Sequence, residues 1–379
     1  MKSYKTFITQ IIVLTVTLIW FNIDVYAQYE DGYNDDKLTY SFLSELHYNN
    51  EVYSSVGSAK SGKFDLHKVY FKAGYKINKN LKFKTAFKVE HAFDSQYNGG
   101  DAFFKQAYFD YYKSPKIGLK VGLVNTPVIS SKSGSYSGVE IAPVEKYLYQ
   151  AWRELGVILY GNFTPAISYQ ASITTGLEAS EISSKSGIYS ARNSDLFTSV
   201  NNLAAAAEMN FRLNANFSMG ASAMISGLQS KQEFGSNLNG AGYTLMEGYA
   251  SYKTGALTTR LVGVYSTIQE SDKINHVLDK HIGSSQYGSL IEINYDILYS
   301  PNKHNRNNHL IIYSRAEAYN TQLTTLGFEA DPKYERYQYT LGLLYKPFKQ
   351  IEFKSDYQWL NSGNSVNLGH LNFAIAYSF

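Results

Sequence analysis

The sequence feature that most constrains the fold is a two-residue hydrophobic alternation that recurs along most of the chain. It is clearest in LKFKTAFKVEHAF, residues 81–93. Leu81, Phe83 and Phe87 share one parity with other apolar residues, whereas Lys82 and Lys84 share the other with further charged residues. Successive side chains of a β-strand point to opposite faces, so this segment is predicted to be a strand with one apolar and one charged face.

The same pattern predicts sixteen strands. Many are about 10–13 residues long, which exceeds the ~5–6 residues usual for soluble proteins and matches the ~9–11 residues of a tilted membrane strand. The predicted strands are 37–48, 64–76, 81–93, 102–113, 117–124, 154–161, 165–175, 202–213, 217–226, 242–252, 256–266, 286–298, 309–319, 334–345, 350–360 and 367–379.

The connections between these strands alternate in length. Short turns lie at 77–80, 114–116 and 346–349, for example, and longer segments rich in Ser, Gly and Asn lie between them, as at 125–153 and 176–201. Outer-membrane barrels combine short periplasmic turns with longer outside loops. The sequence therefore predicts an all-β fold, a transmembrane antiparallel up-and-down β-barrel of about 16 strands with both termini periplasmic. The alternative of a soluble β-sandwich would rarely need so many long, even strands.

The N-terminal segment is expected to be removed. Lys2 and Lys5 precede an apolar run at 7–21, and Ala27 ends a short polar stretch, which is typical of a signal peptide cleaved after residue 27. The alternative of a membrane-anchoring helix would need ~20 apolar residues. The predicted domains are a signal peptide, 1–27, and a barrel, 28–379.

The final strand predicts how the barrel closes. Its sequence LNFAIAYSF alternates to Phe379. Lipid satisfies no backbone hydrogen bonds, so the last strand of a membrane sheet must pair with the first. An amphipathic final strand ending in Phe resembles the C-terminal signal read by the barrel-assembly machinery, and Phe379 is the expected assembly signal.

Composition narrows the function. The formal net charge of +3 is too balanced to suggest a nucleic-acid partner, and the lack of Cys removes disulfide and thiolate chemistry. The 34 Tyr and 21 Phe fit the aromatic girdles of a membrane barrel. The eight His are scattered without metal-ligand spacing, and no nucleophile motif occurs. We therefore expect no metal, no cofactor and no enzymatic activity.

The predicted size implies an aqueous channel, because barrels of sixteen to eighteen strands leave an open interior. The leader at 28–36 is too short to form a plug domain. The longest loop, 125–153, is the third long one and contains apolar residues that a solvated loop would not need. We expect it to fold inward and to form the pore constriction with Lys132, Glu140, Glu145, Lys146 and Arg153.

Charges on the inward parity predict two opposed lumen walls, which would create a field across the pore. A phosphate pore would more naturally be basic all round. The basic wall is predicted to carry Lys68, Lys72, Lys82, Lys84, Lys88 and Lys120. The acidic wall is predicted to carry Glu292, Asp296, Glu317, Glu352 and Asp356, interspersed with Arg315, Arg336 and Lys354.

A family resemblance appears around the long loop. IGLKVGLVNTPV at 117–128 and RELGVILYG at 153–161 resemble the phosphate-selective porin O and P family, which has a glycine-rich strand, a proline, a long inserted loop and then Arg-x-x-Gly-Val. Here Val121, Gly122, Pro127 and Arg153 with Gly156-Val157 match. The resemblance implies a sixteen-stranded, homotrimeric porin, although many family members have no assigned substrate.

These observations predict a passive diffusion channel for small hydrophilic solutes or anions, with phosphate as one candidate. It would lie in the outer membrane of a Gram-negative bacterium, in contact with lipid and lipopolysaccharide. The alternatives are an outer-membrane barrel enzyme and a loop-mediated binding or adhesion barrel. A channel for hydrophobic compounds would need an apolar lumen and an N-terminal hatch, neither of which the sequence indicates.

Overall fold

The computed structural model describes residues 37–57, 61–91, 101–128, 138–140, 142–149, 153–189, 191, 202–229, 238, 240–301 and 308–379. The chain divides into two compact units, Met1–Thr39 and Tyr40–Phe379. The predicted signal peptide and the leader at 28–36 lie outside the described residues.

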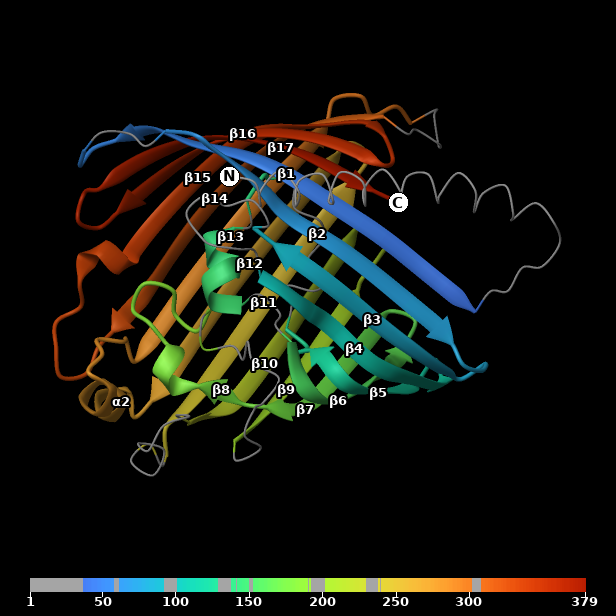
Figure 1. Cartoon of the computed structure of the whole chain (residues 1–379), viewed down its shortest axis with the longest axis horizontal. Helices are drawn as coiled ribbons and strands as arrows, with labels where there is room; N and C mark the ends of the chain where they lie inside the picture. Colours follow the sequence, from blue (N-terminus) through green and yellow to red (C-terminus); the bar gives the residue numbers. More distant parts are fainter. Residues whose placement is uncertain are drawn as a thin grey trace, which may run out of the picture. The chain divides into compact units, whose positions relative to one another are not determined.

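The second unit is a closed antiparallel β-barrel, and within the described residues it has sixteen long strands (Figure 1). Each pairs with the next along the chain, and β1 pairs with β17 to close the sheet. The strands are β1 (Leu38–Ser54), β2 (Lys63–Lys76), β3 (Leu81–Glu90), β4 (Asp101–Ser114), β5 (Ile117–Asn125), β6 (Arg153–Thr164), β7 (Ile167–Thr175), β9 (Leu203–Arg212), β10 (Phe217–Gln229), β11 (Gly242–Thr254), β12 (Leu257–Gln269), β13 (Ser285–Asp296), β14 (His309–Thr324), β15 (Glu335–Phe348), β16 (Ile351–Ser362) and β17 (Asn367–Ser378).

The sixteen predicted strands are confirmed, with differences at their ends. β1 continues to Ser54, six residues beyond its predicted end, and β14 continues to Thr324. In β1 the added residues are largely polar, and they still pair with β17, up to Ser54 opposite Leu368. Their backbone pairing prolongs the strand although the apolar alternation has stopped.

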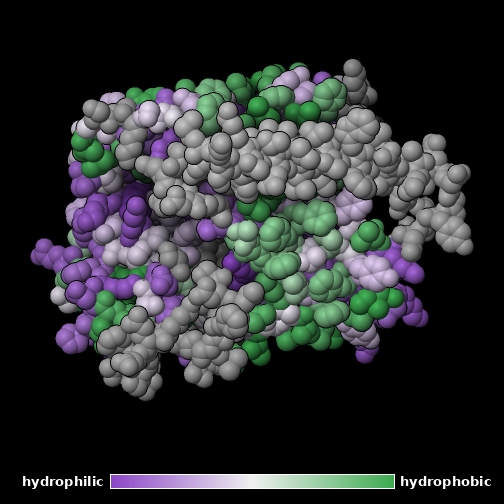
Figure 2. All heavy atoms as spheres, in the orientation of Figure 1, coloured by the Kyte–Doolittle hydropathy of each residue, from purple (hydrophilic) through white to green (hydrophobic). Residues whose placement is uncertain are grey.

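Alternation sorts the side chains of each strand between outside and inside. On β17 the side chains of Phe373, Ile375 and Tyr377 are 44%, 49% and 41% exposed, whereas Ala374 and Ala376 are buried. Figure 2 shows hydrophobic side chains gathered over the outer face of β2–β5, with hydrophilic ones toward both ends of these strands. The barrel therefore has an apolar outer belt, which suits contact with lipid.

Short elements lie in the connections. They are β8 (Leu177–Glu178), which pairs with β10 in parallel, the π-helix η2 (Glu145–Tyr149), the 3₁₀-helices η3 (Ala179–Glu181) and η5 (Pro332–Tyr334), and the helix α2 (Ser271–Leu278). Only a loop was predicted at 267–285, so α2 was missed. Among the described residues, none of the helices is both long and apolar enough to cross a membrane.

The largest apolar cluster lies inside the barrel. Buried inward residues of β10–β13, such as Met224, Leu245 and Leu290, pack with residues that belong to connections. The connection residues include Val144, Leu148, Leu177, Ile182, Ile188, Ile274 and Ile282. The inner side of this wall is thus covered by chain rather than open to the lumen.

Two glycines explain the motif that carried the family resemblance. Gly122 of β5 lies opposite Gly156 of β6. Gly122 has φ +136°, a backbone conformation that favours glycine, and a Cβ there would lie 2.4 Å from the carbonyl oxygen of Ala107. A Cβ at Gly156 would lie 2.3 Å from the carbonyl oxygen of Ile173. The glycines therefore allow close backbone approach at the two strands that flank the long loop.

Candidate functional site

The described part of the long loop reaches strands far from those that it connects. The loop leaves β5 and rejoins β6, yet the amide of Val139 donates to Asp356 Oδ2 on β16 at 2.8 Å. The amide of Val144 donates to Glu317 Oε2 on β14 at 3.1 Å. Both carboxyl side chains are buried, and their neighbours along the strands alternate with them in exposure. The loop segment 138–149 is therefore held by inward side chains of another part of the barrel.

Arg315 of β14 is a buried cation that contacts this loop segment. Its side chain is fully buried, and its Nε lies 2.8 Å from Glu317 Oε1, while Nη1 lies 3.8 Å from Glu292 Oε2. The same guanidinium donates to the carbonyl oxygen of Glu140 at 3.4 and 3.5 Å. A buried carboxylate is costly without a partner, so Arg315 stabilises both acids as well as the loop above them.

The apolar half of the loop segment packs on β13. A Cβ at Gly288 would lie 2.6 Å from Leu148 Cδ1 and 2.9 Å from Val144 Cγ1. The absence of a side chain at Gly288 thus creates room for these two residues. Leu148 is fully buried as a result.

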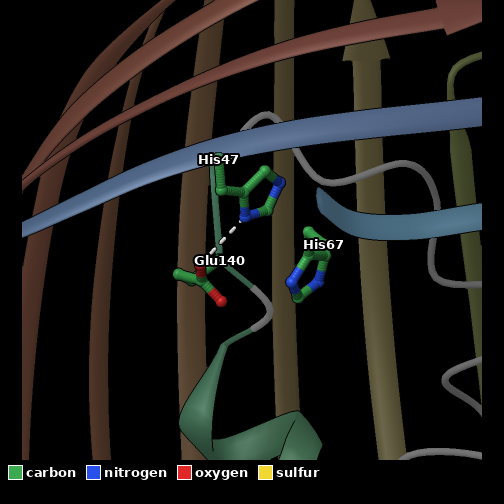
Figure 3. Close-up of side chains that lie close together, drawn as sticks. All are labelled: His47, His67 and Glu140. Atoms are coloured by element: carbon green, nitrogen blue, oxygen red, sulfur yellow. Dashed lines mark hydrogen bonds and ion pairs between the residues drawn. The ribbon is translucent and has the colours of Figure 1, made fainter. Parts of the chain in front are cut away.

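The polar end of the loop segment meets β1. Glu140 Oε1 lies 3.0 Å from Nδ1 of His47 (Figure 3). The same oxygen accepts a hydrogen bond from Asn49 Nδ2 at 3.1 Å. Burial raises the pKa of the Glu140 carboxyl, but the hydrogen bond from His47 and the charges of both nearby histidines outweigh burial, and the pKa falls to about 2. Glu140 is thus an anion in contact with histidine.

A second histidine lies beside the first. The ring of His67, on β2, stacks on the ring of His47 with centroids 4.1 Å apart and an angle of 8° between the planes. Further carboxylates flank the two rings: Glu45 Oε2 is 3.3 Å from the second nitrogen of His47, Nε2, and Asp65 Oδ2 is 3.5 Å from His67 Nδ1. Figure 3 shows His47, His67 and Glu140 converging from β1, β2 and the loop segment.

This arrangement brings potential metal ligands together although no pair of histidines has metal-ligand spacing along the chain. One ligand atom each from His47, His67 and Glu140 lies within 4.8 Å of the others. Spacing along the chain could not indicate this group, because β1 and β2 are neighbours in the sheet and Glu140 belongs to a distant loop. One signal was present: both histidines lie on predicted strands next to each other in sequence.

The five predicted constriction residues have different surroundings. Glu145 is buried in η2, and burial raises its pKa to about 8 despite nearby Arg260 and Arg315. Lys146 Nζ lies 5.2 Å from the centroid of the Tyr189 ring, and the Arg153 guanidinium lies 4.0 Å from that of Phe103. Lys132 lies outside the described residues. The structure therefore places Glu140 and Glu145 near Arg315 of β14, far from the strands that the loop connects, whereas Arg153 is the first residue of β6.

The predicted basic wall lies on β2–β5, and several of its charges are balanced locally. Ion pairs join Lys68 to Glu45 at 2.9 Å, Lys84 to Asp110 at 2.8 Å, and Lys88 to Glu90. Cation–π contacts place Lys72 over Tyr70 and Lys120 over Tyr160, each with Nζ 4.9 Å from the ring centroid. Lys82 is exposed.

Most acids of the predicted acidic wall bind the loop segment or neighbouring side chains of the barrel. Asp356 accepts from the hydroxyl of Tyr313 and from Asn372 as well as from the loop, and Glu317 and Glu292 flank Arg315. Glu352 pairs with Lys346 and Lys354. Asp296 differs, since it contacts His309 and the amides of Leu298 and Leu310 where β13 ends.

Comparison with known proteins supports the fold. No protein-family model matches the chain. An uncharacterized protein of Aquifex aeolicus (strain VF5) is 29% identical over 332 residues, which are 83% of this chain and 73% of that protein. Among solved structures, OmpF of Salmonella typhi is similar with a TM-score of 0.60 and 14% identity, covering 92% of this chain and 99% of that one. An anion-selective porin from Comamonas acidovorans is similar with a TM-score of 0.57 and 10% identity, covering 90% and 99%. At these identities the likeness shows the barrel fold alone.

Proposed function

We propose that this chain is an outer-membrane porin, a passive diffusion channel for small hydrophilic solutes that performs no catalysis. The observation that carries the proposal is a closed sixteen-stranded barrel with an apolar outside and charged side chains inside. Barrels of this size leave an aqueous interior. Solutes would cross beside the lysines of β2–β5, because the opposite inner wall is covered by packed loops.

The long loop would form the constriction of this channel. Its support is the set of contacts that join the segment 138–149 to Asp356, Glu317 and His47, on strands distant from β5 and β6. Glu140 would narrow the passage from one side. Its side chain meets His47 of β1 beside His67 of β2, so the lysines of β3–β5 and Arg153 would lie toward the other side.

The finer proposal is a preference for anions, with phosphate as one candidate solute. It is supported by the predicted basic wall, which includes Lys72, Lys82 and Lys120, and by the resemblance of the loop-flanking motif to the phosphate-selective porin O and P family. The ion pairs of Lys68, Lys84 and Lys88 reduce the net field, so the expected selectivity is modest.

The test is single-channel conductance of the refolded chain in a planar bilayer under a salt gradient. We expect discrete steps and an anion-favouring reversal potential that moves toward zero when Lys72, Lys82 and Lys120 are replaced together by Gln. The matched control is Lys79→Gln, in the turn after β2, which should change nothing. A folded barrel without conductance would refute the channel, and cation preference would refute the anion proposal alone. Block by added phosphate would support the phosphate channel.

Targeting and assembly complete the proposal. Residues 1–27 would be removed on export, both termini of the mature chain would lie on the periplasmic side, and Phe379 would be read by the barrel-assembly machinery. Phe379 is 41% exposed, stacks on Phe42 with centroids 5.4 Å apart, and exchanges backbone hydrogen bonds with it. Lipid and lipopolysaccharide would surround the apolar belt.

A homotrimer is proposed on the basis of the family resemblance and of the outer surface. The outer face of β9–β12 carries a group of small residues among larger ones such as Ile225 and Met246, and a Cβ at Gly263 would meet nothing within 4 Å. The small residues would let a second copy approach closely. Replacing Ala221 and Ala223 by Trp should dissociate the oligomer in mild detergent, whereas Leu341→Trp should not. The small outward residues are Ala205, Ala207, Ala221, Ala223, Gly248, Ala250 and Gly263.

A further inference from the structure

We infer that His47, His67 and Glu140 form a binding site for a divalent transition-metal ion, of the Zn²⁺ class, which tethers the long loop to the barrel wall. The site goes beyond the proposed channel function, since binding does not depend on conduction. It combines two imidazoles with one carboxylate, a donor set that holds Zn²⁺ in proteins with the fourth position left to water.

The geometry supports convergence on one ion. The potential ligand atoms of the three residues lie within 4.8 Å of one another, and Figure 3 shows the side chains converging. Ligands at about 2.0–2.1 Å from a tetrahedral ion lie roughly 3.4 Å apart, so closure requires side-chain shifts of about 1 Å. Glu140 lies on a short loop segment and its side chain is 31% exposed, so it can make such a shift.

The tautomers required for binding are favoured by neighbouring carboxylates. Glu45 lies on Nε2 of His47, which leaves Nδ1 directed at Glu140. Asp65 lies on Nδ1 of His67, and no described residue forms a hydrogen bond with its Nε2. Metal-binding histidines usually donate their other N–H to a carboxylate in this way, which orients the ring and raises its basicity.

Two buried side-chain oxygens near the cluster lack a hydrogen-bond donor within the described part of the chain, which is a second observation that points to a bound ligand. Asn49 Oδ1 and Asp65 Oδ1 are buried with no hydrogen-bond partner among the described residues. A bound metal with its water would supply hydrogen-bond donors near these atoms. The imidazole nitrogens favour Zn²⁺, Ni²⁺ or Cu²⁺, whereas Mg²⁺ and Ca²⁺ prefer sites made of oxygen ligands alone.

His91 defines the outer limit of the cluster. It is 48% exposed, its Nδ1 lies 2.6 Å from Asp65 Oδ2, and with Asp65 and His67 it forms a second potential group of ligands that shares His67. We assign the ion to the inner group because that group includes the buried His47 and joins three separate elements. His91 then acts through Asp65 as a positioning residue.

The test measures Zn²⁺ binding by titration calorimetry on the refolded full chain in detergent after removal of metal with a chelator. We expect one Zn²⁺ per chain. His47→Gln, His67→Gln and Glu140→Gln should each weaken binding at least tenfold, and Glu45→Gln, which removes an outer partner, should weaken it by about 10–100-fold. His91→Gln should weaken it less than His47→Gln.

The matched control is His309→Gln, which breaks a similar pair, His309 Nδ1 to Asp296 Oδ2 at 2.7 Å, away from the cluster. It should leave affinity unchanged. Each variant is first shown to be folded by heat-modifiable migration on a gel. Co²⁺ added to the wild type should give the visible absorption of a four-coordinate site with nitrogen ligands, and the His47→Gln and His67→Gln variants should lose it.

Two results would overturn the inference. One is Zn²⁺ binding that is equal in the wild type and in the variant lacking all three ligands. The other is an effect of His91→Gln larger than that of His47→Gln, which would move the ion to the outer group. In a bilayer, Zn²⁺ should reduce conductance fluctuations in the wild type and not in Glu140→Gln. That measurement depends on channel function, whereas calorimetry does not, so failure of one proposal is distinguishable from failure of the other.

Discussion

The two inner walls of the barrel differ in what covers them. On β10–β14 the inward residues include Met224, Leu245 and Leu290, and they are sealed by loop segments, η2 and α2. On β2–β5 the inward residues include lysines, tyrosines and Asp110. Both walls follow the same strand alternation and have an apolar outside.

The difference shows how connections packed inside a wide barrel can cover one of its inner walls. The wall formed by β10–β14 has an apolar inner surface, so the connections that pack against it bury hydrophobic surface. The other wall offers charges that remain favourable only in contact with water or a counter-charge. The solute path is therefore expected to lie off-centre, along β2–β5. Three changes would break or sharpen this contrast.

The largest expected effect comes from removing the buried cation of the sealed wall. Arg315→Met would leave Glu292 and Glu317 without their partner in a water-poor site, which should cost about 3–5 kcal/mol of stability. Denaturant unfolding in detergent measures the loss. Lys333→Ala, which breaks an exposed loop ion pair with Asp331, is the control and should have no measurable effect. An Arg315→Met barrel as stable as the wild type would mean that the two acids are hydrated.

The second change removes the apolar contact that seats the loop. Leu148→Ala should weaken docking by about 2–5 kcal/mol, because a fully buried leucine leaves a cavity. Conductance should rise and become noisier as the segment 138–149 detaches. Leu326→Ala, at a residue 49% exposed, should leave both quantities unchanged. Unaltered conductance in Leu148→Ala would show that the loop does not limit flow.

The smallest effect is a pH dependence from Glu145. Its pKa rises from 4.5 to about 8 in the fold, so the folded state binds the extra proton between these values and stability should fall as pH rises through that window. Below pH 4.5 the group is protonated in both states and contributes nothing. Glu145→Gln should match the wild type at pH 4 and exceed it at pH 9 in unfolding experiments. Parallel stability curves would contradict the burial of this carboxyl.

The covered wall was only partly predictable. The apolar residues at 125–153 led to the prediction of an inward fold. The helix α2 and the parallel pairing of β8 with β10 were missed. Such connections depend on tertiary packing, as in the space beside Gly288 that Leu148 and Val144 fill. Glu140, a predicted constriction residue, contacts His47 and Arg315, which lie 93 and 175 residues away along the chain. No local pattern encodes such pairs.

The histidine cluster shows where strict alternation fails. His67 and Lys68 are consecutive, yet His67 stacks on His47 and Lys68 pairs with Glu45, both inward residues of β1. A perfectly regular strand would send one of them outward. Alternation applied across the whole strand predicted Lys68 as inward and gave no reason to look at His67.

What the sequence by itself determined is the barrel: strand number, approximate ends, closure, and which parity faces outward. These follow from side-chain alternation and backbone pairing, which act between neighbours and repeat sixteen times along the strands of the structure. Only the tertiary structure decided which charges pair, which loops fill the interior, and that His47, His67 and Glu140 meet. Those contacts depend on the curvature of the closed sheet and on loop packing, which bring together residues with no regular separation along the chain.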